Sequence, residues 1–574
     1  MVLQPPTVQK SIFMKKTIKK IVGVFSLLLA GLSSSVFAEI NFWTDAPNDQ
    51  LADYIVNEMT DEELYSQILM FGWAGAEPSA LLNDWVDRGL GSVKVFGWNT
   101  DDIYQVAKSI SSVQKKASAG RFKIPLFVAT DQEGGWIRHV KGNTSITPGN
   151  MAIGASGYIS DSWYSAYYIS KEIKCLGINM NFAPTVDLFT DHDSTIIGSR
   201  SFGEDPNKSG ILGAAWAAGS IAAGVIPTVK HFPGHGDTPY DSHVFLPEVN
   251  IDWDTFSNRE LVPFSYLVKA GVPAVMSGHL AFPQIDKSGA PASLSKYFLT
   301  DLLRNQMGYQ GLIITDDMMM NGATLYAGSL SSAFRMAIEA GNDIILSSTT
   351  ARLNEALWTV NLKLMQTDEA FKARVKDAAR RVILSKLEYF KSDNAAPLYP
   401  DPSQSNIDKQ VPDKEGELFF LEQACRSITV YKNTANLIPA TEKNSGNILL
   451  VGALPEFFAE GKSRYPKAKE FRFNYELGPN ETQWVCDNIL ATAKSYDTII
   501  INVANERHAT IANKLRESGK KIIILSIMSP VFAEKLEWAD TIIMGYSWSD
   551  WTFKAMMGAL AGEYKATGEA PFIK

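Results

Sequence analysis

The sequence predicts an α/β protein in which a (β/α)8 barrel of the TIM type is followed by a smaller C-terminal α/β sandwich domain. Three observations carry this prediction. The chain has 574 residues, which is too many for one ordinary domain. Between about residues 64 and 350, eight short apolar runs alternate with helical stretches. After a proline-rich break, four more apolar runs follow in the same alternation.

The eight runs of the predicted barrel are apolar through their length and end in polar residues. Strands of this kind, separated by helices, are typical of a parallel sheet that is covered on both faces. In a (β/α)8 barrel, polar residues at the carboxyl ends of the strands form the active site. In chain order the runs are SQILMFGW, SVKVFGW, IPLFVATDQ, INMNFAPTVD, IPTVKHF, PAVMSGHL, GLIITDD and NDIILSS.

The rest of the chain divides at a segment of low apolar content. Residues 391–413 contain four prolines, and this composition indicates a linker between domains. We therefore expect the catalytic barrel over residues 39–390 and a C-terminal α/β domain over residues 414–574. The second domain has the runs NILLVGA, YDTIIINVAN, KKIIILSI and ADTIIMGYS, which favour an open sheet with helical connections.

Composition narrows the class of protein. A net charge of −8 gives no basic surface for nucleic acid. A hydrophobic content of 45% predicts a large packed core rather than disorder. The cysteines Cys175, Cys425 and Cys486 do not form a disulfide framework, and a single Cys425–Cys486 bridge is left open.

The N-terminus reads as an extension and a signal peptide over residues 1–38. From Met14 the chain runs MKKTIKK, then IVGVFSLLLAGL, then SSSVFA, which is a basic segment, a short apolar segment and a cleavage site after Ala38. The apolar segment is too short to span a bilayer, so we expect no stable membrane span after cleavage. The predicted location is periplasmic or secreted, and the alternative is an N-terminal anchor that stays uncleaved.

The densest polar motif is TVKHFPGHGDTPYDSHVFLPE, residues 228–248, which holds three of the seven histidines in the chain. It leaves the fifth predicted strand at Lys230 and His231. Asp241 and His243 lie two apart in an extended segment, so their side chains can face the same way. A carboxylate beside an imidazole fixes its tautomer and raises its basicity, which suits a general acid/base. A zinc site and a polar loop without chemistry are the alternatives; no helical pair aims these ligands, so no metal is predicted.

Three further motifs place polar residues at strand ends. Asp316 and Asp317 directly follow the seventh run, and because adjacent strand residues point to opposite faces, only one of them can face the barrel mouth. We expect the other to hold neighbouring backbone. For each of the three motifs taken alone, a cap, a turn or an ion pair is a simpler interpretation than a catalytic or binding role. The remaining candidates are Asp131, Glu133 and Arg138 in ATDQEGGWIRHV, and Arg200 in IIGSRSFGEDP.

Together, KHFPGHGDTPYDSH, TDQEGG, GSRSFGEDP and GLIITDDMMM resemble the motifs of the bacterial β-N-acetylglucosaminidases of glycoside hydrolase family 3. The resemblance covers residues 60–390, and the C-terminal portion is similar to the second domain of that family. It implies that Asp316 is the nucleophile that forms a glycosyl-enzyme. It also implies that His243 is the acid/base, paired with Asp241.

The resemblance also implies a set of substrate contacts. Sugar hydroxyls and the N-acetyl group would be bound by Asp131, Arg200, Lys230 and His231. The family has arginine eight positions after the aspartate of DQEGG, where this chain has His139. The neighbouring Arg138 is therefore taken as the candidate contact at this place.

The implied activity is that of an exported, retaining exo-β-N-acetylglucosaminidase. Such an enzyme releases terminal N-acetylglucosamine from peptidoglycan fragments or chitooligosaccharides through a covalent intermediate on Asp316. An imidazole can protonate the leaving oxygen and then deprotonate water, so no cofactor is expected, and the partner is a small carbohydrate. The sequence does not predict the oligomeric state.

Several alternatives stay open. A β-glucosidase or xylosidase of the same family would take a catalytic glutamate from the second domain. A non-catalytic glycan-binding protein would have lost its nucleophile. Phosphorolysis in place of hydrolysis is a third alternative, because a neutral histidine tolerates an incoming phosphate better than a carboxylate would.

Overall fold

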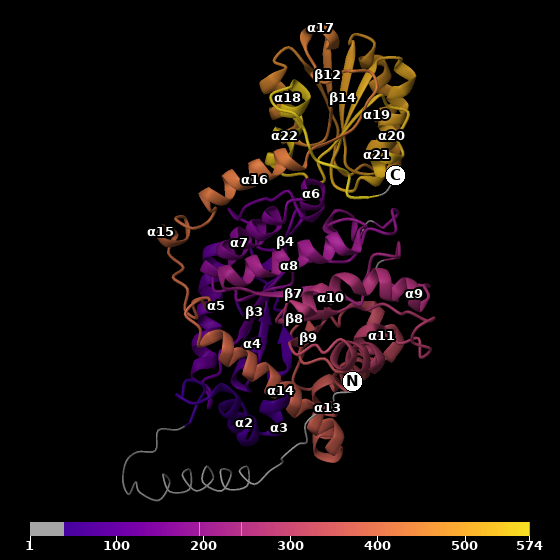
Figure 1. Cartoon of the computed structure of the whole chain (residues 1–574). Helices are drawn as coiled ribbons and strands as arrows, with labels where there is room; N and C mark the ends of the chain where they lie inside the picture. Colours follow the sequence, from indigo (N-terminus) through magenta and orange to yellow (C-terminus); the bar gives the residue numbers. More distant parts are fainter. Residues whose placement is uncertain (1–39, 195, 241, 243, 573–574) are drawn as a thin grey trace, which may run out of the picture.

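A barrel of parallel strands carries a second sheet domain at one end, as the computed structural model of residues 40–194, 196–240, 242 and 244–572 shows (Figure 1). The expected signal peptide and its cleavage site after Ala38 lie outside the described residues. The barrel precedes the C-terminal domain in the chain, and that domain lies above it in the view of Figure 1. The two-domain α/β architecture predicted from the sequence is confirmed.

Each of the eight apolar runs contains one strand of the barrel. The strands are parallel neighbours in the order β10-β1-β2-β3-β6-β7-β8-β9, and a parallel bridge between Ile314 and Ile344 joins the last strand to the first. The strands are β1 (Leu69–Phe71), β2 (Ser92–Lys94), β3 (Phe127–Thr130), β6 (Met180–Asn181), β7 (Ile226–Phe232), β8 (Ala274–Ser277), β9 (Leu312–Thr315) and β10 (Ile345–Ser347).

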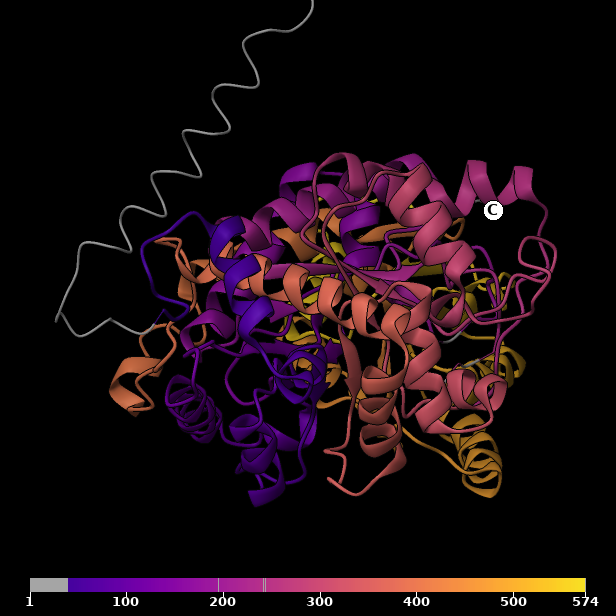
Figure 2. The same cartoon turned by 90° about the horizontal axis from the view of Figure 1, so that it is seen from below.

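Helices surround these strands, as the view from below also shows (Figure 2). Helix α5 (Ile103–Ser118) illustrates why they form: Asp102 caps it by accepting from the N–H groups of Tyr104 and Gln105, and its apolar face is buried. The main helices of this layer are α2 (Asn48–Glu58), α3 (Asp61–Gln67), α4 (Ala80–Asp87), α5, α7 (Ile159–Cys175), α8 (Pro206–Ala223), α10 (Leu261–Lys269), a π-helix (Tyr297–Gln306), α12 (Leu330–Ala340), α13 (Ala356–Thr367) and α14 (Glu369–Phe390).

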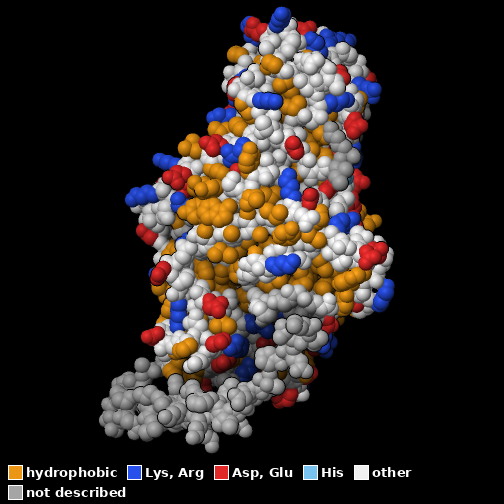
Figure 3. All heavy atoms as spheres, viewed as in Figure 1, with side chains coloured by type: hydrophobic (Ala, Val, Ile, Leu, Met, Phe, Trp, Pro, Cys, Tyr) orange, Lys and Arg blue, Asp and Glu red, His pale blue; other side chains and the backbone are white. Residues whose placement is uncertain are grey.

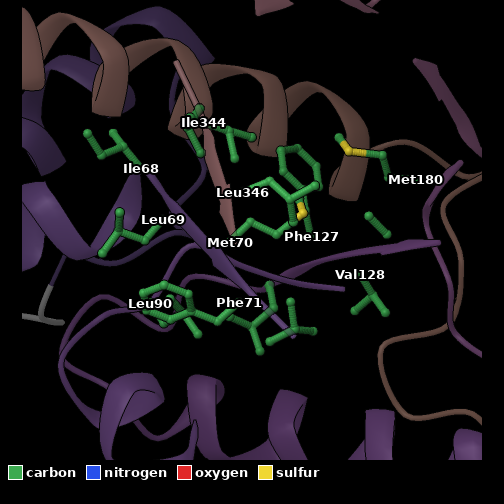
Figure 4. Close-up of a cluster of buried hydrophobic side chains, with 14 of the residues drawn as sticks. Ile68, Leu69, Met70, Phe71, Leu90, Phe127, Val128, Met180, Ile344 and Leu346 are labelled. Carbon is green, nitrogen blue, oxygen red and sulfur yellow. The ribbon is translucent and has the colours of Figure 1, made fainter. Parts of the chain in front are cut away.

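The barrel core explains why the strand runs are continuously apolar. Strand β1 is buried on both faces, because one face looks into the barrel and the other meets the helices. Leu69, Met70 and Phe71 pack with Phe127 and Leu346 from other strands (Figure 4). Full burial of one such side chain stabilises the fold by about 1.5–3 kcal/mol, so a strand of three buried residues holds its place despite its shortness.

The C-terminal domain is a six-stranded sheet between two helical layers, with strand order β11-β16-β15-β14-β12-β13. Alternate residues of a strand enter different cores: Leu449 and Val451 face one layer, whereas Ile448 and Leu450 face the other. The strands are β11 (Thr429–Asn433), β12 (Ile448–Gly452), β13 (Lys469–Arg472), β14 (Thr498–Val503), β15 (Lys521–Ser526) and β16 (Thr541–Met544). The helices are α16 (Lys414–Ser427), α17 (Glu442–Ser445), α18 (Pro455–Arg464), α19 (Pro479–Ala493), α20 (Glu506–Leu515), α21 (Val531–Glu534) and α22 (Asp550–Ala561).

Residues 391–413 connect the domains while packing on the barrel. Ile407 and Val411 are buried in the barrel core, and a short helix, α15 (Gln404–Ile407), lies in this segment. The N–H of Asp413 donates to Glu172 Oε1 at 2.8 Å. The segment is therefore held against the barrel along much of its length rather than acting as a loose tether.

The two domains share contacts through the segments that follow strands β3 and β6. Arg426 makes a bidentate ion pair with Asp161, with distances of 2.7 and 3.1 Å. Met151 and Phe189 from the barrel enter the core of the C-terminal sheet. The bridge between Cys425 and Cys486 that the sequence left open does not form, since all three cysteines are free.

Apolar side chains gather on one outer face of the barrel, over α7, α8 and α10 (Figure 3). Exposed apolar side chains of α7 and α8 include Ile159, Tyr164, Ile211 and Ile221. No helix in the described part of the chain has the length and apolar content that crossing a bilayer needs.

Candidate active site

A cavity of about 610 Å³ opens at the carboxyl ends of the barrel strands. This is the end at which barrel enzymes place their active sites. Strand ends and the loops after them supply the lining, and every described lining residue belongs to the barrel. The lining is Lys94, Phe96, Trp98, Asp131, Glu133, Trp136, Ile137, His139, Ile196, Arg200, Lys230, His231, His235, Ser242, Asp316, Asp317, Met319, Met320 and Ser348.

The deep side of the cavity is a connected network of buried charges. Lys230 Nζ lies 2.7 Å from Asp131 Oδ1 and 2.6 Å from Glu133 Oε1. Asp131 Oδ2 is 2.7 Å from Lys94 Nζ. Arg200 holds both oxygens of Glu133, at 2.8 and 3.0 Å. Such a network is stable only because each charge has an opposite partner, and it presents both donors and acceptors to a polar ligand.

The electrostatics keep these carboxyl groups ionised. Burial raises the pKa of Glu133, but the charges of Arg200 and Lys230 outweigh burial and lower that pKa to about 2. Burial acts against ionisation of Asp131 as well, yet Lys230 and Lys94 hold its pKa well below the ordinary value. The same partners raise the pKa of Lys230 although burial opposes this. Asp131, Glu133 and Lys230 are therefore charged at neutral pH.

Asp187, His231 and Asp316 form a line of three groups beside this network. His231 Nδ1 lies 2.6 Å from Asp187 Oδ2, and the His231 N–H also donates to Asp187 at 3.1 Å. This contact leaves the other ring nitrogen, Nε2, facing Asp316 Oδ2 at 3.9 Å. A carboxylate behind an imidazole fixes its tautomer and orientation, so Asp187 aims His231 at Asp316.

Asp316 and Asp317 both line the cavity, although the sequence predicts only one of them at the barrel mouth, and their side chains make different contacts. Asp316 lines the cavity, and its Oδ1 accepts from the Asp317 N–H at 2.8 Å. Burial raises the pKa of Asp316, but His231, His279 and the Asp317 N–H lower it to about 2. Asp317 Oδ1 accepts from the N–H groups of Met319 and Ser348, at 3.0 and 2.9 Å. Asp317 thus binds neighbouring backbone through its Oδ1, whereas Asp316 Oδ2 is directed toward His231.

The loop after β7 is described only in part. Asp241 and His243, the predicted acid/base pair, lie outside the described residues. Ser242 between them is buried; its carbonyl accepts from Gly322 N at 3.2 Å, and its Oγ lies 3.1 Å from His235 Nε2. Burial and the nearby His231 lower the pKa of His235 to about 4, so His235 is neutral at pH 7. Its contact with Ser242 is therefore made by an uncharged imidazole.

Comparison with known families bears on this cavity. The family described as glycosyl hydrolase family 3 N-terminal domain matches residues 59–384, which is more than half of the chain. The chain belongs to glycoside hydrolase family 3. It is therefore a glycoside hydrolase, an enzyme that acts on a carbohydrate substrate.

Individual relatives agree with this membership. The chain is 37% identical to β-hexosaminidase A of Pseudoalteromonas piscicida over 279 residues, which are 46% of this chain and 46% of that protein. It is 31% identical to β-hexosaminidase of Xylella fastidiosa (strain M23) over 301 residues, which are 51% of this chain and 87% of that protein. The chain thus spans less than half the length of the first relative and most of the second.

Among solved structures, the chain is similar to a glycoside hydrolase family 3 β-N-acetylglucosaminidase from Paenibacillus sp. str. FPU-7. The TM-score is 0.80 and the sequence identity 26%, over 90% of this chain and 99% of that chain. The similarity therefore extends over both domains and not only over the barrel that the family match covers.

At the position where the family motif departs, the structure separates two neighbouring residues. Arg138 Nη1 donates to the carbonyl of Thr144 and, at 3.2 Å, to Thr144 Oγ1, and Arg138 is not among the residues that line the cavity. His139 does line it, with Nδ1 3.5 Å from Asp131 Oδ2. Burial lowers the pKa of His139 to about 4. His139 rather than Arg138 thus occupies the place that the sequence assigned to a substrate contact.

Sequence reasoning missed two members of the site and left Glu133 without a role. Lys94 is the single charged residue of the second apolar run, and Asp187 ends the fourth. A charge within a strand that is otherwise buried is a signal that could have found both, because such a charge needs a partner. Asp131, Arg200, Lys230, His231 and Asp316 do come together as the sequence predicts.

The described residues show no group of three His, Cys, Asp or Glu side chains placed to hold a metal ion. The histidines of the site that the structure describes instead face carboxylates, hydroxyls and backbone. His279, for example, meets Ser293 Oγ at 2.7 Å and the carbonyl of Asp317 at 3.1 Å.

Proposed function

We propose that this hydrolase is an exported, retaining exo-β-N-acetylglucosaminidase with Asp316 as its nucleophile. Asp316 attacks the anomeric carbon while the glycosidic oxygen leaves with a proton from His243. Water, deprotonated by the same histidine, then releases the sugar from Asp316. Both steps need a carboxylate that is ionised throughout and a second group that changes its protonation.

The observation that carries this proposal is the environment of Asp316. Its carboxyl group lines the cavity with a pKa of about 2, so it is ionised wherever the enzyme works. One oxygen is held by the Asp317 N–H, whereas Oδ2 faces the cavity side of His231 at 3.9 Å. Among the described residues, no hydrogen-bond donor lies close to Oδ2, and a half-buried, charged oxygen of this kind suits a nucleophile.

The charged network beside Asp316 suits a sugar. Asp131 and Glu133 offer acceptors, and Lys94, Arg200 and Lys230 offer donors. A pyranose presents hydroxyls that donate and accept at once, so a mixed network can bind several of them. Because this network closes the deep side of the cavity, a terminal sugar fits better than the middle of a chain, which supports the exo assignment.

Two observations support a histidine as the acid/base. Ser242, which lies between Asp241 and His243 in the sequence, is anchored to His235 and Gly322 and lines the cavity. No residue of the C-terminal domain is among the described lining residues. A β-glucosidase of this family would need a glutamate from that domain, so the arrangement favours the histidine branch.

The preference for an N-acetylated sugar is supported by the relatives, which are named β-hexosaminidase. Peptidoglycan fragments and chitooligosaccharides both end in this sugar, and we propose them as the substrate class. Aryl β-N-acetylglucosaminide should be turned over far faster than aryl β-glucoside. Equal rates, or a preference for the glucoside, would overturn the sugar assignment.

The nucleophile can be trapped directly. A 5-fluoro-N-acetylglucosaminyl fluoride should leave one sugar on the peptide that contains Asp316, detected by mass spectrometry after digestion. Asp316→Ala should abolish both turnover and labelling. Asp317→Asn is the matched control, because it keeps an oxygen for the Met319 and Ser348 N–H groups and should still be labelled. A label on Asp317 would move the nucleophile by one residue.

Export has its own test. Cell fractionation followed by N-terminal sequencing should find the protein in the periplasm or medium, beginning at Glu39. A membrane-bound protein that keeps residues 14–38 would instead favour the uncleaved anchor.

A further inference from the structure

The rim of the cavity is aromatic, in contrast to its charged depth. Trp98 is 53% exposed and Trp136 is 37% exposed, yet both line the same cavity as Lys94 and Asp131, which are 5% and 8% exposed. The lining therefore combines buried charges with exposed aromatic surface. A terminal sugar held by the charges would leave its neighbour at the aromatic rim.

Trp98 is fixed in place with one face covered. Its ring stacks on Phe96 with centroids 4.4 Å apart and an interplanar angle of 5°. Its Nε1–H donates to the carbonyl of Trp73 at 2.8 Å. The polar atom is therefore used and one face is packed, so the remaining exposed surface is flat and apolar. Nothing in the fold requires a ring of this size to be half open to solvent.

Trp136 is held by a rigid hairpin. It lies between β4 (Gln132–Gly134) and β5 (Ile137–Arg138), after Gly134 and Gly135, whose φ angles of 94° and 59° suit glycine. The Gly135 N–H donates to Thr147 Oγ1 at 3.0 Å. The carbonyl of Thr147 accepts from Ser547 Oγ of the C-terminal domain at 3.2 Å, so both domains support the hairpin that carries Trp136.

We propose that Trp98 and Trp136 form the binding site for the leaving-group sugar, the pyranose that follows the cleaved bond. One face of a β-linked pyranose is lined by C–H groups, and a rigid indole offers a large apolar surface to it at low entropic cost. The continuity of both rings with the cavity that holds Asp316 selects this occupant, because the sugar next to the cleaved bond must lie at that exit. This inference rests on the proposed function and adds the specificity for the aglycone.

Comparison of two substrates isolates this site. N-acetylglucosaminyl fluoride has no leaving-group sugar, whereas N,N′-diacetylchitobiose has one. Trp98→Ala and Trp136→Ala should lower the ratio of kcat/KM for the disaccharide to kcat/KM for the fluoride by roughly 10- to 100-fold, as loss of one stacking partner does. Trp98→Phe, which keeps a ring without the Nε1–H, should recover most of that ratio.

The matched control is Trp484→Ala, which removes a 61% exposed tryptophan of the C-terminal domain and should leave the ratio as in wild type. An equal loss on both substrates would place the rings at the first sugar and overturn the proposal, as would an unchanged ratio. If the proposed function itself is wrong, the result is different: wild type would then hydrolyse glucosyl fluoride faster than N-acetylglucosaminyl fluoride. In that case the same variants on glucosyl fluoride and cellobiose test the rim, and the same fall in ratio is expected.

Discussion

The Nε2 atom of His231 lies 3.9 Å from Oδ2 of Asp316. This separation is too long for a hydrogen bond but short enough for the two groups to affect each other's charge. The opposite ring nitrogen is held by Asp187 at 2.6 Å, so the imidazole cannot turn away. Asp316, the proposed nucleophile, thus owes part of its low pKa to a histidine whose direction is set by a third residue.

Asp187→Asn should therefore lower kcat/KM by at least about 100-fold, or about 2.7 kcal/mol of transition-state stabilisation. The amide would place a donor against the His231 ring and against the N–H groups of His231 and His235, all of which face this carboxylate. Steady-state kinetics with a chitobiose substrate and with an activated aryl glycoside should show the same loss.

His231→Ala should also lower kcat/KM equally on both substrates, since neither Asp187 nor His231 is the proposed proton donor to the leaving group. A loss confined to the poorer leaving group would assign His231 to proton donation.

His243→Ala should show the opposite pattern. General acid catalysis increases the rate by roughly 10²- to 10⁴-fold. An activated aryl leaving group departs with little need for this protonation. The rate of His243→Ala should therefore fall by that factor on the natural disaccharide and much less on the aryl glycoside. Asp241→Ala should show the same pattern with smaller losses of rate. Rate plotted against leaving-group pKa, for wild type and variant, is the measurement. Identical slopes would mean that His243 is not the acid.

Arg138 and His139 are neighbours with different expected effects. Arg138→Ala leaves the Thr144 carbonyl without its guanidinium donor and should lower the free energy of unfolding by about 1–2 kcal/mol, with KM little changed. His139→Ala should raise KM by roughly 10-fold, the equivalent of one lost hydrogen bond to substrate. Thermal melts and KM for both variants separate the two roles. A raised KM for Arg138→Ala with unchanged melting would return Arg138 to the substrate site.

His235 predicts a stability that declines on acidification. Burial and the nearby His231 lower its pKa from an ordinary 6.5 to about 4. Between these two pH values the unfolded chain binds a proton that the folded chain does not, so stability falls as pH drops from about 6.5 to 4. The full contribution of this one group is about 3 kcal/mol.

His235→Gln removes this titration, so its unfolding free energy should fall less steeply over the same pH range, whatever its value at pH 7. Denaturant unfolding at several pH values measures the slope. His508, which is buried in the C-terminal domain with a pKa also lowered to about 4, gives the matched variant His508→Gln. That variant should flatten the slope without changing kcat. Parallel slopes for wild type and His235→Gln would show that folding does not lower the pKa of His235.

The sequence by itself determined the strands and many of the strand-end residues that line the cavity. A strand that is buried on both faces must be apolar throughout. All eight barrel strands and the four central strands of the second sheet could therefore be predicted from the sequence. The polar residue that ends such a run, like Asp316, must lie at the active end of the barrel. Strand β13, with the sequence KEFR, was missed because an exposed edge strand needs no apolar run.

The tertiary structure alone decided which groups act on one another. Lys230 meets Glu133 although 97 positions separate them in the chain, and Asp187 meets His231 across 44. It also decided that His139 enters the cavity while Arg138 turns to Thr144. The physical reason is that charge interactions and burial depend on distances through space. The local sequence pattern sets which way a side chain points from its own strand. The residue that this side chain contacts comes from another part of the chain and reaches it only when the barrel closes.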